Sequence, residues 1–177
     1  MARVPPVRYE GADRPTQAAF DQIVAAQGRM TNMKATLAHS LPALDALMQW
    51  YPLREEVQTF LEARSTMLFV YAISAATDCL ICSTFFRRLL IDAGENPDDL
   101  KMNDREQVVV DFARQLVRDP NQVSDELYAR LGQQFSPPQI VALTAFGAMM
   151  IATNVFNNAL RIDLDEYLQP YRRVAAK

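Results

Sequence analysis

The sequence predicts an all-α protein, a single helical domain of seven or eight helices. Apolar residues recur three and four positions apart along most of the chain, which is the spacing of one helix face. No segment shows the strict alternation of apolar and polar residues that marks a half-buried strand. Only five of the 177 residues are glycine, whereas β-rich folds use glycine in their many turns. These observations favour a helical bundle over a fold that contains a sheet.

Residues 1–14 are predicted to form an extended arm, and residues 15–177 the helical domain. The arm contains two prolines, one glycine and three arginines without periodicity, a composition typical of loops. Arms of this kind are solvated or lie on a partner subunit, and both arrangements fit the sequence.

Helix signals follow one another through the domain. Pro15 suits the first turn of a helix, and Ser136 suits an N-cap. Thr77-Asp78 supplies good N-cap residues within a long apolar stretch, and Gly94 suits the position just after a helix. The predicted helices span about 16–29, two short segments within 37–48 broken near Pro42, 53–76, 79–93, a segment begun by Asn103 or Asp104, 124–134, 136–160 and about 163–168.

Composition and charge exclude several classes of protein. Half of the residues are hydrophobic and 22% are charged, which excludes a disordered chain. The net charge is −3 without a basic stripe, so we expect no nucleic-acid or anionic-membrane partner. The start of the chain lacks the apolar core of a signal peptide. The longest apolar runs, 67–76 and 140–153, are shorter than the ~18 residues of a membrane span. We therefore expect a cytoplasmic protein.

The two cysteines, Cys79 and Cys82, form a C-x-x-C motif at the start of a predicted helix. Residues three apart on a helix share a face, so the two sulfurs are close enough for a disulfide. Free backbone N–H groups and the helix dipole stabilise a thiolate there and lower a thiol pKa below its usual ~8.5. Arg87 and Arg88 follow one to two turns later and would add positive potential. The motif indicates a dithiol–disulfide couple.

Metal binding and haem attachment by the cysteine pair both fail for lack of ligands. A structural zinc site needs four ligands, but the chain has no second cysteine pair and a single histidine, His39. Haem attachment needs a histidine directly after the second cysteine, where this chain has Ser83. We therefore expect no metal and no cofactor. The alternative that stays open is that the cysteines are two small buried apolar residues.

The remaining polar residues of interest fit structural roles. We expect His39 to be a surface or packing residue. Asn154, Asn157 and Asn158 lie near the end of the last long helix and are spaced to share one face. Helix ends or a subunit contact would satisfy these amides, and a substrate pocket is the alternative.

The segment Ala-Ala-Thr-Asp-Cys-Leu-Ile-Cys at 75–82, after an apolar helix, resembles the carboxymuconolactone decarboxylase superfamily on its alkyl-hydroperoxidase D (AhpD) side. Residues 152–165 carry the same resemblance, as do 30–33 and 41–44, so that it extends over about 20–168. It implies an AhpD-like helical fold that assembles into dimers, trimers or hexamers.

The resemblance also implies thiol chemistry. Cys82 would attack a small hydroperoxide, Cys79 would resolve the sulfenic acid as a disulfide, and an external dithiol would reduce the pair. The family's proton relay places a glutamate twelve residues before the first cysteine and a histidine four residues after the second. This chain has Met67 and Phe86 at those positions, and neither side chain transfers a proton.

Three functional hypotheses follow. The first is a thiol–disulfide oxidoreductase with peroxidase activity, in a homo-oligomer whose proton relay is degenerate. The second is an enzyme of the decarboxylase type that acts on a small acid or lactone. The third is a catalytically retired oligomer that binds a small apolar ligand between its helices.

Overall fold

Local sequence signals place most helices of the structure, a computed structural model that describes residues 1–173. Side chains that accept a hydrogen bond from a backbone N–H three residues later cap five helices: Asp13, Thr31, Ser40, Asn103 and Ser124. Gly94 has a φ of 82° just after a helix, as expected. The last four residues of the predicted domain, 174–177, lie outside the described residues.

Nine α-helices and three short 3-10 helices make up the secondary structure of residues 1–173, where no strand occurs. The α-helices are α1 (Arg14–Gln27), α2 (Asn32–Leu37), α3 (Leu41–Met48), α4 (Trp50–Gln58), α5 (Ala63–Ala76), α6 (Leu80–Asp92), α7 (Asp104–Arg118), α8 (Asp125–Gln134) and α9 (Pro137–Leu160). The 3-10 helices are η1 (Tyr9–Gly11), η2 (Pro120–Gln122) and η3 (Glu166–Tyr171). The all-helical fold predicted from the sequence is confirmed.

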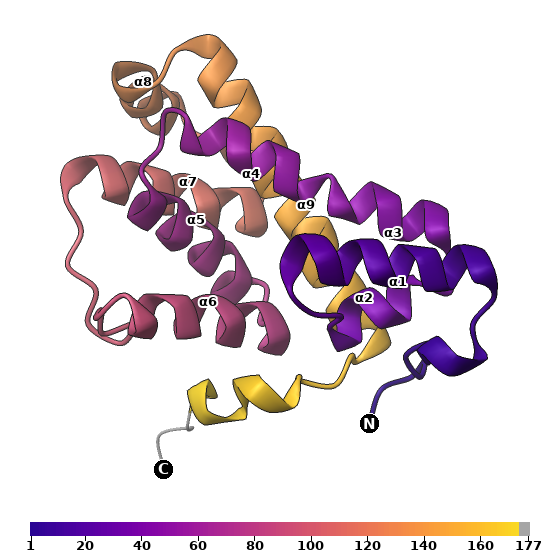
Figure 1. Cartoon of the computed structure of the whole chain (residues 1–177). Coiled ribbons are helices and arrows are strands. Elements are labelled where there is room, and N and C mark those ends of the chain that lie inside the picture. The colour runs from indigo at the N-terminus through magenta and orange to yellow at the C-terminus, as the bar shows by residue number, and fades with distance from the viewer. Residues whose placement is uncertain (174–177) are drawn as a thin grey trace.

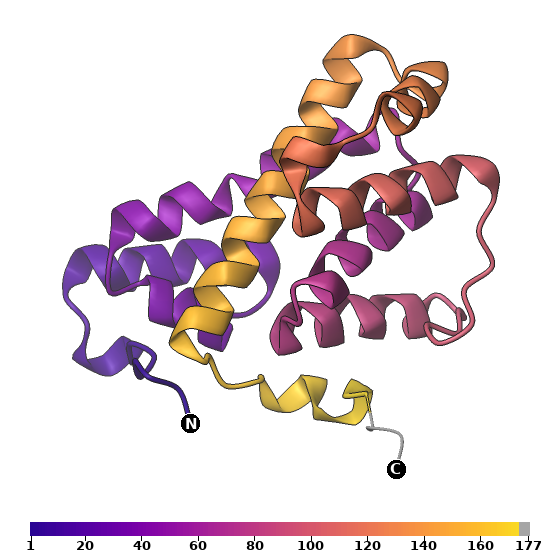
Figure 2. The same ribbon diagram turned by 180° about the vertical axis from the view of Figure 1, so that it is seen from behind.

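Helix α9 runs the length of the molecule between two groups of helices (Figures 1 and 2). On one side, α5 packs against α6, α7 and α9. On the other side lie α1 to α3, and α4 lies along α9. A large hydrophobic core fills the first group, and a smaller one lies beneath α1 to α3. Met33 and Phe156 pack against both cores. The candidate site lies where the two groups meet.

The helix predicted over 53–76 is two helices, α4 and α5. The break covers residues 59–62, where the Thr59 hydroxyl donates to the Glu56 carbonyl oxygen at 2.7 Å. Thr66 then donates to the carbonyl oxygens of Leu61 and Glu62. Threonine hydroxyls that bond to nearby carbonyls compete with helix continuation. The apolar pattern does not reveal this break, because Leu61 is buried in the core and continues the pattern through it.

The N-terminal arm lies on its own chain. The Arg3 N–H donates to the Leu160 carbonyl oxygen at 2.8 Å, and the Val7 N–H donates to that of Ala35 at 3.0 Å. His39 Nε2 lies 2.9 Å from the Pro5 carbonyl oxygen. The single histidine therefore has a packing contact with the arm, as expected.

Helix α9 is long and apolar enough to cross a membrane by length and composition alone, with a mean hydropathy of 1.6 over its best window. The apolar run 140–153, predicted to be too short for a membrane span, is thus part of a longer helix that extends beyond it on both sides. The helix packs against α3, α4, α5, α6, α7 and α8, which is the setting of a core helix.

Candidate active site

The junction between α5 and α6 differs from the N-cap predicted at Thr77-Asp78. Thr77 ends α5, Asp78 adopts the left-handed conformation with a φ of 50°, and Cys79 is the N-cap of α6. Aspartate is one of the few residues that tolerate this conformation. The turn aims the Cys79 N–H at the Ser74 carbonyl oxygen, 3.0 Å away. It therefore places the first cysteine where the free N–H groups of α6 begin.

Two of the three asparagines of α9 hold this junction. Asn154 Nδ2 donates to Thr77 Oγ1, and Asn158 Nδ2 donates to the Thr77 carbonyl oxygen, each at 2.8 Å. Asn158 thereby satisfies a carbonyl group at the end of α5, which is one of the roles expected for these amides. The third, Asn157, reaches the sulfurs instead.

Both cysteines are unbonded and buried, with 0% of Cys79 and 6% of Cys82 exposed. Asn157 Nδ2 lies 3.3 Å from Cys82 Sγ and 3.9 Å from Cys79 Sγ. The same nitrogen lies 3.5 Å from Met33 Sδ. The amide therefore donates into a cluster of sulfur atoms, and its position favours negative charge on the cysteine pair.

The two thiols differ in acidity. The hydrogen bond from the Cys82 thiol, the backbone N–H groups of Cys82 and Ile81, and the Asn157 amide lower the pKa of Cys79 to about 7, against the effect of burial. The bond to Cys79 and burial raise the pKa of Cys82 well above its usual range. The first proton thus leaves the pair near neutral pH, and the charge is centred on Cys79.

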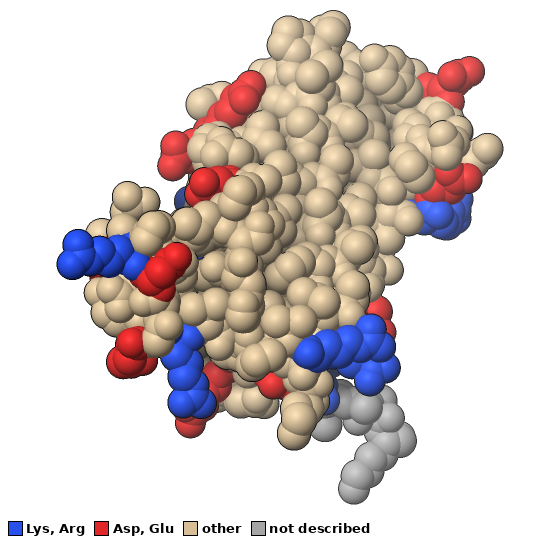
Figure 3. Space-filling view, turned by 90° about the vertical axis from the view of Figure 1, so that its right-hand side faces the viewer, with Lys and Arg blue, Asp and Glu red and all other residues tan. Residues whose placement is uncertain are grey.

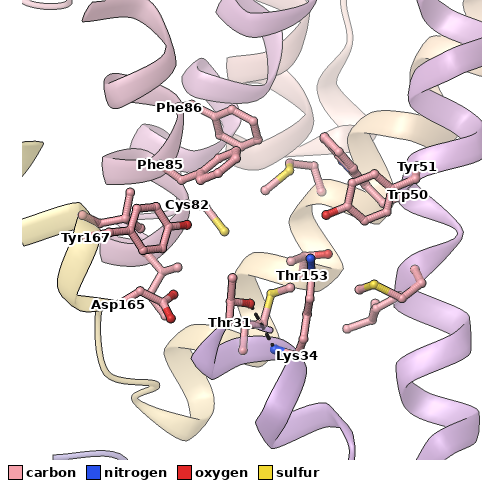
Figure 4. Close-up of a pocket in the computed structure, with 16 residues that line it drawn as sticks. Thr31, Lys34, Trp50, Tyr51, Cys82, Phe85, Phe86, Thr153, Asp165 and Tyr167 are labelled. Atoms are coloured by element: carbon pink, nitrogen blue, oxygen red, sulfur yellow. Dashed lines mark hydrogen bonds between the residues drawn. The ribbon is translucent and has the colours of Figure 1, made fainter. Parts of the chain in front are cut away.

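A pocket with a cavity volume of about 110 Å³ opens beside Cys82 (Figure 4). Helices α4 and α6 face each other across it, and α2 and the C-terminal segment close it below. Most of its lining is apolar or aromatic. The lining residues are Thr31, Met33, Lys34, Leu47, Met48, Trp50, Tyr51, Ile81, Cys82, Phe85, Phe86, Met150, Thr153, Asp165, Tyr167 and Leu168. Cys82 reaches this pocket, whereas Cys79 does not line it.

Two charged side chains line the pocket. Lys34 is 4% exposed and extends from α2 into the space between α4 and α6 (Figure 4). Burial lowers the pKa of Lys34 to about 8. Asp165 accepts a hydrogen bond from the Asn32 N–H at 2.9 Å, and burial raises the pKa of its carboxyl group. Lys34 and Asp165 therefore form one polar side of a pocket that is otherwise mostly apolar.

No protein-family model matches the chain, and no curated protein matches it in sequence. The chain is similar in structure to an uncharacterized peroxidase-related protein from Ralstonia eutropha JMP134 with an alkylhydroperoxidase AhpD core. The TM-score is 0.75 at 17% identity, over 94% of each chain. A peroxidase-related protein from Silicibacter sp. TM1040 gives a TM-score of 0.74 at 19% identity, over 91% of this chain and 92% of that one. The chain has the AhpD-like fold.

The debrominase Bmp8 shares this AhpD-like fold. Its apo structure gives a TM-score of 0.75 at 16% identity, over 95% of each chain. A cysteine-to-alanine variant of Bmp8 in complex with 2,3,4-tribromopyrrole gives a TM-score of 0.75 at 15% identity, over 95% of this chain and 94% of that one. Peroxidase-related proteins and a debrominase therefore share the fold, so the fold alone does not specify an activity.

Within the AhpD-like fold, the two relay positions have apolar environments. Phe86 lines the pocket and contacts Trp50, with the ring centroids 6.2 Å apart. Met67 packs against the main core and does not line the pocket. Arg87, expected to add positive potential, forms a bidentate pair with Asp98 at 2.6 and 3.0 Å. Its charge is thereby largely compensated.

Lys34 and Asp165 were not predicted as site residues, and Asn157 was assigned no contact with the thiols. Lys34 follows directly after the 30–33 segment, and Asp165 ends the 152–165 segment. The signal that could have pointed to them is a charged residue beside apolar neighbours in or directly after these segments. Among residues 1–173, no group of three His, Cys, Asp or Glu side chains is placed to hold a metal ion.

Proposed function

We propose that Cys79 and Cys82 form a redox couple that reduces a small molecule with a mainly apolar body, such as an organic hydroperoxide, bound in the pocket beside Cys82. One observation carries the proposal: Cys82 lines an aromatic pocket while its partner occupies the N-cap of α6. A dithiol catalyst needs one sulfur that contacts the substrate and a second sulfur beside it that is stabilised as a thiolate, and the pocket and the helix N-terminus supply these two positions.

The pair supplies its own base in this mechanism. The Cys82 thiol is the group that most lowers the pKa of Cys79, so the Cys79 thiolate is placed to take the Cys82 proton as Cys82 attacks. The Cys82 sulfur then bonds to the outer peroxide oxygen, the O–O bond breaks, and the leaving alkoxide takes a proton from Cys79. This arrangement replaces the histidine and glutamate of the relay, whose positions hold Phe86 and Met67.

Disulfide formation completes the oxidative half of the cycle. The regenerated Cys79 thiolate attacks the Cys82 sulfenic acid, the S–O bond breaks, and hydroxide leaves and becomes water. The substrate gains two electrons and the cysteine pair loses two. An external dithiol then returns two electrons and two protons by thiol–disulfide exchange.

A second candidate reaction is reductive debromination of a small aromatic ring. It is favoured by the aromatic lining of the pocket and by the likeness to Bmp8. This reaction also consumes two electrons from the cysteine pair: hydrogen replaces bromine on the ring, bromide leaves, and the two thiols become a disulfide. Both reactions need the same cysteine pair. A brominated pyrrole that oxidises the pair and releases bromide, where the matched unbrominated pyrrole does neither, would show debromination.

We also propose a reducing cytoplasm as the setting and a homo-oligomer as the working form. Reduction of the pair by an external dithiol needs a compartment that keeps thiols reduced. The outer face of α9, which carries no charge and is partly exposed, supports the oligomer.

Mass spectrometry of alkylated protein tests the redox couple. After exposure to cumene hydroperoxide, the wild-type chain should contain an intramolecular disulfide that a dithiol reverses. Two alkylated thiols that persist after oxidant would overturn the proposal.

The two single variants test the roles of the cysteines. Cys79→Ser should accumulate a sulfenic acid on Cys82 that a dimedone probe captures, because no resolving thiol remains. Cys82→Ser should give little captured product, because Cys79 is fully buried. Capture on Cys79 in place of Cys82 would reverse the assignment.

A further inference from the structure

We infer that the pocket binds a one-ring anion, an aromatic carboxylate or a comparably acidic ring, with its negative group on Lys34 and its ring facing Cys82. The inference deepens the proposed function and rests on it, because it names the class of molecule that the cysteine pair would reduce. Four features of the pocket support it: a buried amine, a set of surrounding cations, a compensated carboxylate and a small volume.

The first feature is the Lys34 ammonium group. Its three N–H bonds have one acceptor among residues 1–173, the Gln27 side-chain oxygen. The amine also lies 5.4 Å from the centre of the Tyr51 ring. Burying a cation without an anion in contact is costly. A lysine held in this way inside a pocket is therefore poised to bind an anion.

The second feature is a set of arginines that stack on the aromatic lining. Arg29 lies 4.1 Å from the centre of the Tyr167 ring, and Arg54 lies 5.6 Å from that of Trp50. Arg88 lies 5.3 Å from that of Phe85, and its charge is partly compensated by the Asp92 carboxylate, 3.8 Å away. Arg54 has no ion-pair partner within the described part of the chain, and its Nε is buried without an acceptor there. In a chain of net charge −3, this concentration of positive charge attracts anions to one place.

The third feature is the compensation of the one carboxylate in the lining. Asp165 accepts from the Asn32 N–H and is influenced by the positive charges of both Arg29 and Lys34. No ion pair within 4 Å joins Asp165 to Lys34 in residues 1–173. One carboxylate is therefore influenced by two cations, Lys34 in the lining and Arg29 outside it. Asp165 thus compensates the charge of Lys34 only in part.

The fourth feature is size. The cavity of about 110 Å³ is comparable to an engineered apolar cavity of ~150 Å³ that binds benzene. It therefore suits one ring and excludes a fused ring system or a long acyl chain. Trp50, Phe85 and Phe86 provide flat surfaces for such a ring (Figure 4).

Ligand binding can be followed without any thiol reaction. Trp50 is the only tryptophan in the chain and lines the pocket, so its fluorescence reports occupancy. Benzoate and benzamide are matched probes, equal in size and differing in charge. We expect benzoate to bind the wild-type protein at least about tenfold more tightly than benzamide at neutral pH and low salt. Equal affinities would overturn the inference.

Lys34→Met is the decisive variant, because methionine keeps the apolar stem and removes the charge. It should lose the preference for benzoate and keep the binding of benzamide. Lys101→Met, at an exposed lysine whose partner is Asp99, is the matched control and should behave as wild type. A Lys34→Met protein that still prefers benzoate would also overturn the inference.

The two proposals fail separately. A protein that forms the Cys79–Cys82 disulfide with peroxide but ignores benzoate refutes the anion site alone. A protein that binds benzoate through Lys34 but keeps both thiols free after oxidant refutes the redox function and leaves the anion site standing.

Discussion

Cys79 and Cys82 share a helical turn, yet their surroundings separate their chemistry. Cys79 receives hydrogen bonds from Cys82 and from the start of α6, whereas Cys82 is buried beside an emerging thiolate. The spacing in the sequence predicts the pair but not this order of acidity. The order depends on which cysteine becomes the N-cap of α6. The left-handed conformation of Asp78 gives this position to Cys79.

The acidity of the pair can be measured through thiolate absorbance, which needs no access to the buried sulfurs. The wild-type protein should gain the first thiolate near pH 7. Cys82→Ser should keep this midpoint close to 7, because the serine hydroxyl still donates to Cys79. Cys79→Ser should lose this midpoint, and Cys82 should titrate above the usual ~8.5, because its burial remains after the Cys79 thiolate is removed. A low midpoint that is kept in Cys79→Ser and lost in Cys82→Ser would contradict the assignment of the thiolate to Cys79.

Lys34 should lower the stability of the folded protein at neutral pH. Its pKa is about 8 when folded and 10.5 when unfolded. Between these values the unfolded chain binds the extra proton, so stability rises as pH increases through this window. Below pH 8 Lys34 is charged in both the folded and the unfolded state, so the full free-energy cost of burying its charge remains. Lys34→Met should therefore be more stable at pH 7 by on the order of 2 kcal/mol.

Urea unfolding of Lys34→Met and wild type at pH 7 and pH 10 measures this effect. The gap between the two proteins should narrow at the higher pH, and a constant gap would exclude titration of Lys34 as its cause. A lysine that costs stability in the absence of ligand is consistent with a role in binding.

At the scale of elements, the turn between α5 and α6 depends on one residue in the left-handed conformation. Asp78 has a φ of 50°, which costs a β-branched residue roughly 1–2 kcal/mol. Asp78→Val should therefore lower the free energy of unfolding by about that amount. Asp78→Asn and Asp78→Gly are the controls, since both residues tolerate this conformation. Equal stability of the valine and glycine variants would contradict the strain.

Helix α9 passes close to α5 and α7 at Gly147. A methyl group there would lie 2.9 Å from Leu116 Cδ1 and 3.0 Å from Phe69 Cζ. Phe69 stacks between two other rings and has little room to move. Gly147→Ala should therefore lower the free energy of unfolding by about 1 kcal/mol or more, although alanine is the better helix former.

Gly132→Ala is the matched control for this contact. It lies on α8 with no atom within 4 Å of the added methyl group, so it should gain up to about 1 kcal/mol. Thermal unfolding of both variants gives the comparison. Stabilisation by both substitutions would show that α9 has more room than the contact distances allow.

The helices were predictable because periodicity and caps act over a few residues, as at Ser136 and Gly94. The division of 53–76 was not, because Phe60 and Leu61 keep the apolar pattern through the break. The thiol pair was visible as a motif, but Asn157 reaches it from 75 residues away. The burial of Lys34 likewise depends on α4, α6 and the C-terminal segment meeting around it. Such contacts are properties of the fold and leave no local pattern.

At the scale of the whole molecule, α9 has one face in the core and an opposite face that nothing covers within the described residues. The helix contains no charged residue. Val141 and Val155 are 69% and 57% exposed. Exposed positions recur at alternating steps of four and three: Val141, Ala145, Ala148, Ala152, Val155 and Ala159. This is the spacing of a helix–helix seam, and its small residues permit close approach.

Other parts of the surface are also poor in charge. Figure 3 shows one face on which Lys, Arg, Asp and Glu lie mainly toward the edges, with a broad area between them that carries none. An exposed apolar stripe on a rigid core helix is typical of a surface buried between subunits. We therefore expect α9 to pack against a second copy of this chain.

Light scattering at micromolar concentration should give a multiple of the 20.0 kDa chain mass. Ala148→Glu places a charge in the middle of the stripe and should shift the mass toward that of one chain, because an unpaired carboxylate resists burial. Ala129→Glu, on an exposed position of α8, is the matched control and should leave the assembly intact. Circular dichroism of both variants verifies that they are folded. A wild-type mass of about 20 kDa would contradict the predicted oligomer, and an Ala148→Glu protein that stays assembled would place the interface on another face.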